Sequence, residues 1–134
     1  MLFRSNALFA AHKHYGTLVL ALVLLVILVA LVKGPKPVLQ RIVAVLVDIN
    51  LVVGLVAVLQ AESRNVSWFH PIFALGAVGL LHAAAKSEDK AKVVRCFSLA
   101  LLLLVAAWAV NASWGPAFLK STWLIKSVPA AVGQ

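Results

Sequence analysis

Apolar residues fall into four long runs that are separated by short polar connectors. The runs cover about 15–32, 38–60, 69–85 and 93–111. A helix needs roughly 17–25 predominantly apolar residues to cross the hydrocarbon core of a bilayer, and each run reaches that length. Gly and Pro in the first connector, "KGPKP", end one helix and permit the next. The pattern predicts one all-α domain over residues 1–134: an integral membrane, up-and-down bundle of four transmembrane helices.

The two ends of the chain are amphipathic in composition. Residues 1–14 interleave Leu and Phe with Arg, Ser and Asn, which favours a short helix lying in the membrane interface before the first span. Trp and Lys prefer the depth of the lipid headgroups. The segment after Asn111 contains several such residues, and we expect it to lie at the interface: Trp114, Phe118, Lys120, Trp123 and Lys126.

Composition and charge support this assignment. Hydrophobic residues make up 63% of the chain, whereas soluble domains have about 45–50% apolar residues. We therefore attribute the net charge of +8 to membrane topology and contact with lipid headgroups, and we expect no nucleic-acid partner. The single cysteine, Cys96, excludes an internal disulfide and a Cys-x-x-Cys centre.

The distribution of Lys and Arg predicts the orientation. Seven cations lie in or beside the first and third connectors: Lys33, Lys36, Arg41, Lys86, Lys90, Lys92 and Arg95. The other side of the bundle has five: Arg4, Lys13, Arg64, Lys120 and Lys126. Because positive charge favours the cytoplasm, both termini should face outward. The expected location is the inner or plasma membrane of a bacterium or archaeon.

Polar residues within the spans fall at two depths. Short connectors make neighbouring spans antiparallel, so residues at one depth can be paired by counting outward from each connector. At the outer level, counting places His12 near His70, with Trp108 of the fourth span at the same depth. At the inner level, Asp48 of the second span falls next to His82 of the third.

The inner pair has two interpretations. An ionisable residue within a span costs roughly 2.5–3.5 kcal/mol by insertion scales, so Asp48 should face the bundle interior and find a partner, for which His82 is available. The pair is either a structural hydrogen bond between the second and third spans, or a proton relay or polar wall of a quinone or small-molecule pocket.

The outer histidines also have two interpretations. A b-type haem with two axial imidazoles needs histidines at one depth on facing helices, which His12 or His14 provides together with His70. Trp108 would then pack near the haem. The alternative is that His12 and His14 extend toward interfacial water and that His70, which precedes Pro71, caps its helix. One haem is the most that the histidines allow, because the inner level has no second histidine.

Four short motifs resemble those of small four-helix membrane proteins described as cytochrome b-like. They are "AAHKHYG" before the first span, "DINLVVGL" in the second, "FHPIFALGAVGLLH" in the third, and the Trp-bearing end of the fourth. The resemblance implies a haem b whose iron ligands are His70 with His12 or His14. A second histidine pair is missing, so the resemblance does not extend to two-haem transmembrane cytochromes b.

Two functional hypotheses follow. In the first, the protein is a small b-type cytochrome or haem-associated electron-transfer subunit of a respiratory or photosynthetic membrane complex, with a quinone as a further candidate ligand. In the second, it is a haem-free accessory or assembly subunit that packs against a larger membrane complex or a second copy of itself. No hydrolase or transferase motif is present in the sequence, and we expect no catalytic activity of the chain on its own.

Overall fold

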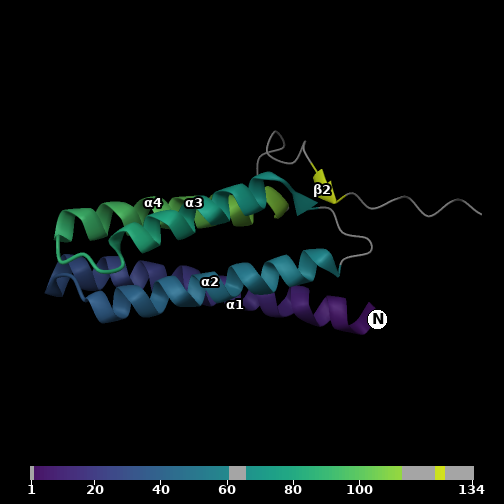
Figure 1. Ribbon diagram of the computed structural model, residues 1–134, viewed down its shortest axis with the longest axis horizontal. Helices are drawn as coiled ribbons and strands as arrows, with labels where there is room; N and C mark the ends of the chain where they lie inside the picture. The colour runs from purple at the N-terminus through teal and green to yellow at the C-terminus, as the bar shows by residue number, and fades with distance from the viewer. Residues whose placement is uncertain (1, 61–65, 113–122, 126–134) are drawn as a thin grey trace, which may run out of the picture.

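Four helices in alternating directions form the body of the protein. The computed structural model describes residues 2–60, 66–112 and 123–125. In chain order the elements are α1 (Leu2–Lys33), α2 (Pro37–Leu59), β1 (Val66–Ser67), α3 (Phe69–Ala84), α4 (Lys90–Asn111) and β2 (Trp123–Ile125). Figure 1 shows α1–α2 and α3–α4 as two antiparallel pairs, with the start of α1 and the end of α4 at the same end of the molecule. The prediction of an all-α, four-helix fold is confirmed.

The α1–α2 and α3–α4 connectors meet at one end of the bundle, which we call the connector end; the opposite end is the terminal end. Gly34 has φ +81, the left-handed conformation that commonly ends a helix. Pro37 follows as the first residue of α2, where its missing N–H costs no helical hydrogen bond. At the second connector, the side chain of Asp89 accepts a hydrogen bond from the backbone N–H of Ala91 at 2.9 Å and so caps α4.

Small and β-branched side chains fill the core. Each helix contacts the next one around the bundle, and α1 also contacts α4. The buried cluster runs along all four helices and includes Val19, Val23, Val26, Val43, Val47, Ala77, Leu81, Phe97 and Ala100. Many leucines and isoleucines point outward instead. An apolar exterior of this extent is compatible with a membrane protein.

Three of the four helices are long and apolar enough to cross a bilayer, judged over the described residues: Ala7–Lys33, Pro37–Leu59 and Lys90–Asn111. Helix α3 has 16 residues, which gives a length of about 24 Å at 1.5 Å per residue. The hydrocarbon core is about 30 Å thick. The predicted third span, 69–85, is therefore an apolar helix that is shorter than a full crossing.

The N-terminal segment differs from its prediction. Helix α1 is continuous over 32 residues from Leu2, so the expected separate interfacial helix is instead the first part of the same helix. The segment up to Tyr15 contains neither Gly nor Pro, and nothing in it ends a helix.

The C-terminal segment takes part in a strand pairing that the sequence did not predict. Strand β2 pairs antiparallel with β1, with Val66 opposite Ile125 and Ser67 opposite Trp123. This pairing connects the end of the chain to the segment that leads into α3. The interfacial position expected for Trp114, Phe118, Lys120 and Lys126 lies outside the described residues.

Candidate functional site

His12 and His70 lie together near the terminal end of the bundle. The centres of their imidazole rings are 5.8 Å apart, and the ring planes are inclined at 80°. His12 is on α1 and His70 is the second residue of α3, so the two rings come from helices that are not consecutive in the chain. The structure thus brings together one of the two histidine pairs considered for iron ligation.

Each of these imidazoles is anchored through its Nδ1 atom. His70 Nδ1 donates to the backbone carbonyl of Ala107 on α4 at 2.6 Å. His12 Nδ1 lies 3.1 Å from the backbone oxygen of Asn50 on α2 and 3.1 Å from its side-chain Oδ1. A carbonyl oxygen only accepts, so the proton is on Nδ1 in both rings. In a neutral imidazole this leaves the lone pair on Nε2, the atom that can bind a metal.

Gly54 makes the position of His12 possible. A Cβ atom at residue 54 would lie 2.6 Å from Cε1 of His12 and 3.0 Å from its Nδ1. Gly54 is one helical turn after Asn50, so the absence of a side chain there lets the ring reach the Asn50 carbonyl. At Gly16 the space is also limited, because a Cβ would lie 3.3 Å from Nδ2 of Asn50. The sequence reasoning did not assign Asn50 and Gly54 to this site; the signal that could have found them is their spacing of four residues.

His70 is positioned by the polar residues around the start of α3. The side-chain oxygen of Asn111, the last residue of α4, accepts from the backbone N–H of Ser67 at 3.3 Å. The hydroxyl of Ser67 in turn accepts from the backbone N–H of Phe69 at 3.3 Å, and Ser67 is fully buried. These contacts join the beginning of α3 to the end of α4 and hold His70 beside Ala107.

His14 does not join the pair. His14 is exposed, and two residues along a helix correspond to a rotation of about 200°, so it points to another side of α1 than His12 does. Trp108 is 47% exposed and follows Ala107 on α4. Of the two candidate partners for His70, the structure places His12 beside it.

Asp48 and His82 form the second polar pair, between α2 and α3. Asp48 Oδ2 and His82 Nε2 are 2.8 Å apart. The pair is not enclosed, since 48% of the His82 side chain and 36% of the Asp48 side chain are exposed. The depth counting had placed these residues next to each other. Their exposure differs from the expectation that Asp48 faces the bundle interior: the pair bridges two helices at the bundle surface.

Gln40 is a buried polar residue that the sequence reasoning missed. Its Nε2 donates to the backbone carbonyls of Ala84 at 3.0 Å and Ser87 at 2.9 Å, and its Oε1 accepts from the backbone N–H of Lys36 at 2.7 Å. These backbone groups belong to the last residue of α3, to the connector that follows it and to the residue before α2. Gln40 therefore joins the start of α2 to the end of α3 at the connector end.

No family model matches the chain, and no curated protein or solved structure matches it significantly. Within the described residues, no three or more His, Cys, Asp or Glu side chains are grouped so that they could hold a metal ion. The arrangement relevant to iron is thus the His12–His70 pair, and function is inferred from its geometry.

Proposed function

We propose that the protein is an integral membrane haem protein of the b type, in which His12 and His70 would hold the iron of one haem. The observation that supports this proposal most is the position of the two imidazoles. Their ring centres lie 5.8 Å apart, and each donates a hydrogen bond from Nδ1 to a carbonyl oxygen. Both rings thus keep Nε2 for iron. The proposal includes a membrane that all four helices cross, with α3 as the third span, and in which both termini face outward.

The donor set fits a haem. An imidazole nitrogen binds a metal at about 2 Å and lies about 1 Å from the centre of its ring, so two imidazoles on one iron have ring centres about 6 Å apart. The observed separation is 5.8 Å. Histidine ligands also usually donate their other N–H to a carbonyl or carboxylate, which fixes the tautomer and increases the basicity of the ligand nitrogen. The carbonyls of Asn50 and Ala107 are in that position.

When bound, the haem would supply one-electron transfer. The residues of the chain would bind and orient it: Asn50 and Ala107 hold the two imidazoles, and Gly54 leaves room for the ring of His12. The apolar surroundings of the pair would limit access of water, which is one of the factors that set a haem potential. The pair lies near the terminal end, so electrons would be exchanged with a partner subunit at that face.

The Asp48–His82 pair has a second candidate role, suggested by its exposure. A hydrogen-bonded carboxylate and imidazole that are open at the helix surface can exchange protons with a quinone head group. If they do, Asp48→Asn slows the reduction of the haem by decylubiquinol, whereas Glu88→Gln, which alters an exposed acid in the connector, does not. Equal rates for the two variants would leave the pair as a structural hydrogen bond.

The test of haem binding is spectroscopic. The protein is purified from cells supplied with haem, and its reduced-minus-oxidised spectrum and pyridine haemochrome are recorded. We expect one b-type haem per chain, which is lost in His12→Ala and in His70→Ala. His14→Ala and His82→Ala serve as matched controls and should keep it.

Two results would contradict the assignment. If His14→Ala loses the haem and His12→Ala keeps it, the iron ligand on α1 is His14 and not His12. Absence of a b-type α band in the wild-type protein would favour the haem-free accessory subunit, for which the apolar exterior of the bundle offers a contact surface for a membrane partner.

A further inference from the structure

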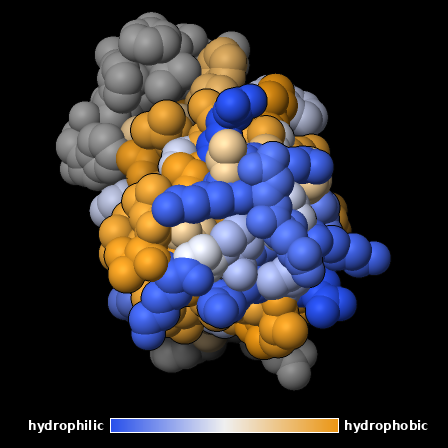
Figure 2. Space-filling model, turned by 90° about the vertical axis from the view of Figure 1, so that its left-hand side faces the viewer, coloured by the Kyte–Doolittle hydropathy of each residue, from blue (hydrophilic) through white to orange (hydrophobic). Residues whose placement is uncertain are grey.

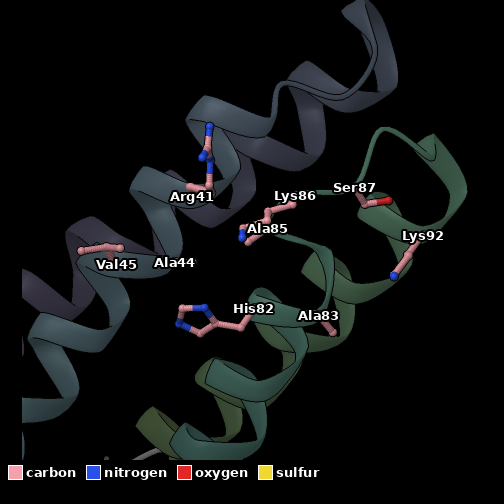
Figure 3. Close-up of a pocket in the computed structure, with 9 residues that line it drawn as sticks. All are labelled: Arg41, Ala44, Val45, His82, Ala83, Ala85, Lys86, Ser87 and Lys92. Atoms are coloured by element: carbon pink, nitrogen blue, oxygen red, sulfur yellow. The ribbon is translucent and has the colours of Figure 1, made fainter.

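A cavity of about 600 Å³ opens between α2 and α3 at the connector end. Its size falls in the range of small-molecule sites, roughly 300–1,000 Å³. Helix α2 contributes Arg41 and Val45 to the wall, and His82 and Lys86 come from α3 and the residues that follow it. Lys92, at the start of α4, is a further cation of the cavity wall. In Figure 3, His82 points from α3 toward α2, with Arg41 on one side of the cavity and Lys86 and Lys92 on the other.

The cations of this cavity have no carboxylate partner in the described part of the chain. The one ion pair found there joins Asp48 to His82, and no described acidic residue lines the cavity. Arg41 uses its Nε for the carbonyl of Pro37 at 3.3 Å, which leaves the two terminal nitrogens of the guanidinium for another acceptor. Figure 2 shows hydrophilic residues gathered over this end of the molecule. An anion would therefore find several donors on the cavity wall, where the carboxylate of Asp48 is engaged with His82.

A second hollow, of about 370 Å³, continues from the first along α2. It shares Arg41 and Val45 with the first, and its remaining lining residues are apolar: Val38, Ile42 and Leu46. The combined site is thus cationic at the level of the connectors and apolar along the helix. A cationic surface followed by an apolar one matches a phospholipid, in which the phosphate lies in the headgroup and the hydrocarbon chains extend from it.

We propose that this groove binds one anionic phospholipid, with the phosphate among Arg41, Lys86 and Lys92 and an acyl chain along Val45 and Ile42. Basic pockets between transmembrane helices on the cytoplasmic side are suited to anionic headgroups. The excess of Lys and Arg at this end assigns it to that side. The inference is independent of haem, whose proposed ligands lie toward the opposite end.

The test uses native mass spectrometry of the delipidated protein in detergent, with dioleoyl phosphatidylglycerol as the anionic probe and dioleoyl phosphatidylcholine as the zwitterionic one. We expect the anionic lipid to bind at least about tenfold more tightly, because each Lys or Arg near an anionic group contributes a few-fold in affinity. The triple variant Arg41→Ala, Lys86→Ala, Lys92→Ala should lose this preference.

A matched triple variant removes the same charge from the same end outside the cavity: Lys33→Ala, Lys36→Ala and Arg95→Ala. It should keep the preference, and an equal loss in both triples would overturn the proposal in favour of diffuse surface attraction. Val45→Trp should fill the apolar groove and weaken lipid binding without changing charge. Unchanged lipid binding in Val45→Trp, or full displacement of the lipid by millimolar inorganic phosphate, would show a site for free anions and would also overturn the proposal.

Discussion

Replacing Gly54 by Ala should displace His12 while leaving the fold intact. The new Cβ would lie 2.6 Å from Cε1 of His12, whereas ordinary contacts begin at 3.4 Å, so the two atoms must separate by about 0.8 Å. The ring is at the end of a rotatable side chain, and it can move away more easily than two helices can. We therefore expect the ring to leave the Asn50 carbonyl.

The cost in stability should be small. Loss of the hydrogen bond between His12 and Asn50 costs about 0.5–1.5 kcal/mol. Replacing Gly by Ala inside a helix contributes about 0.8–1 kcal/mol in the opposite direction. The free energy of unfolding of Gly54→Ala should thus stay within about 1 kcal/mol of the wild type. Haem binding should suffer more, because disturbing the partner that orients a metal ligand typically costs 10–100-fold in affinity.

Gly79→Ala is the control, since a Cβ at residue 79 would meet no atom within 4 Å. Two assays apply to both variants: haem titration of the purified apoprotein, and nitrogen NMR of ¹⁵N-labelled histidine, which reports the protonated Nδ1 of His12 whether or not haem binds. Gly54→Ala should lose the His12 tautomer signal and weaken haem binding by about 10–100-fold, and Gly79→Ala should change neither. Wild-type signals in both assays for Gly54→Ala would refute the reasoning.

Three further substitutions probe the rest of the bundle. Gln40→Ala removes the partner of the Ser87 carbonyl and of the Lys36 N–H, whereas the Ala84 carbonyl keeps the N–H of Ser87. At about 1–3 kcal/mol for each unpaired group, and at the low end because both are only partly buried, the free energy of unfolding should fall by about 2 kcal/mol. Gln60→Ala at an exposed position should have little effect in the same denaturation experiment. A double-mutant cycle with Asp48→Asn and His82→Ala should give a coupling energy of about 0.6–1.7 kcal/mol in detergent, the range for polar pairs between membrane-spanning helices. A coupling energy of zero would mean that the pair does not form. Lys90→Met removes the ammonium that donates to the carbonyl of Leu31 at 2.8 Å and should cost about 0.3–1 kcal/mol, the range for a cation at an exposed helix C-terminus, as measured by thermal unfolding.

Much of the architecture was predictable because hydrophobic runs and connectors are properties of contiguous sequence. Apart from the start of α1, the four helices begin and end close to the boundaries expected from apolar run lengths. Gly34, Pro37 and Asp89 terminate or start helices through their own backbone or side-chain chemistry. Counting from the connector between the second and third spans also placed Asp48 beside His82, because both lie about equally far from it and both helices rise at the same rate per residue.

Other features depend on contacts that no local pattern encodes. Counting from the connectors places His12 opposite Leu59 or Gln60 of the second span, but its ring meets Gly54 and Asn50, about one and a half to three helical turns away. Whether His12 or His14 faces His70 depends on how α1 is rotated about its axis relative to its neighbours. The sequence does not determine this rotation. The pairing of β1 with β2 joins segments more than fifty residues apart, and its strands are too short to show alternation.

In the proposed membrane setting, the unequal helix lengths would make the protein asymmetric toward the surrounding lipids. Helix α2, at 23 residues, is about 34 Å long, whereas α3 is about 24 Å long at the same rise per residue. In a bilayer of about 30 Å, the leaflets beside α3 would have to thin by about 6 Å, and such mismatch costs fractions of a kcal/mol per Å. The energy is reduced where the membrane is already thin, so the length of α3 alone would sort the protein laterally toward thinner regions.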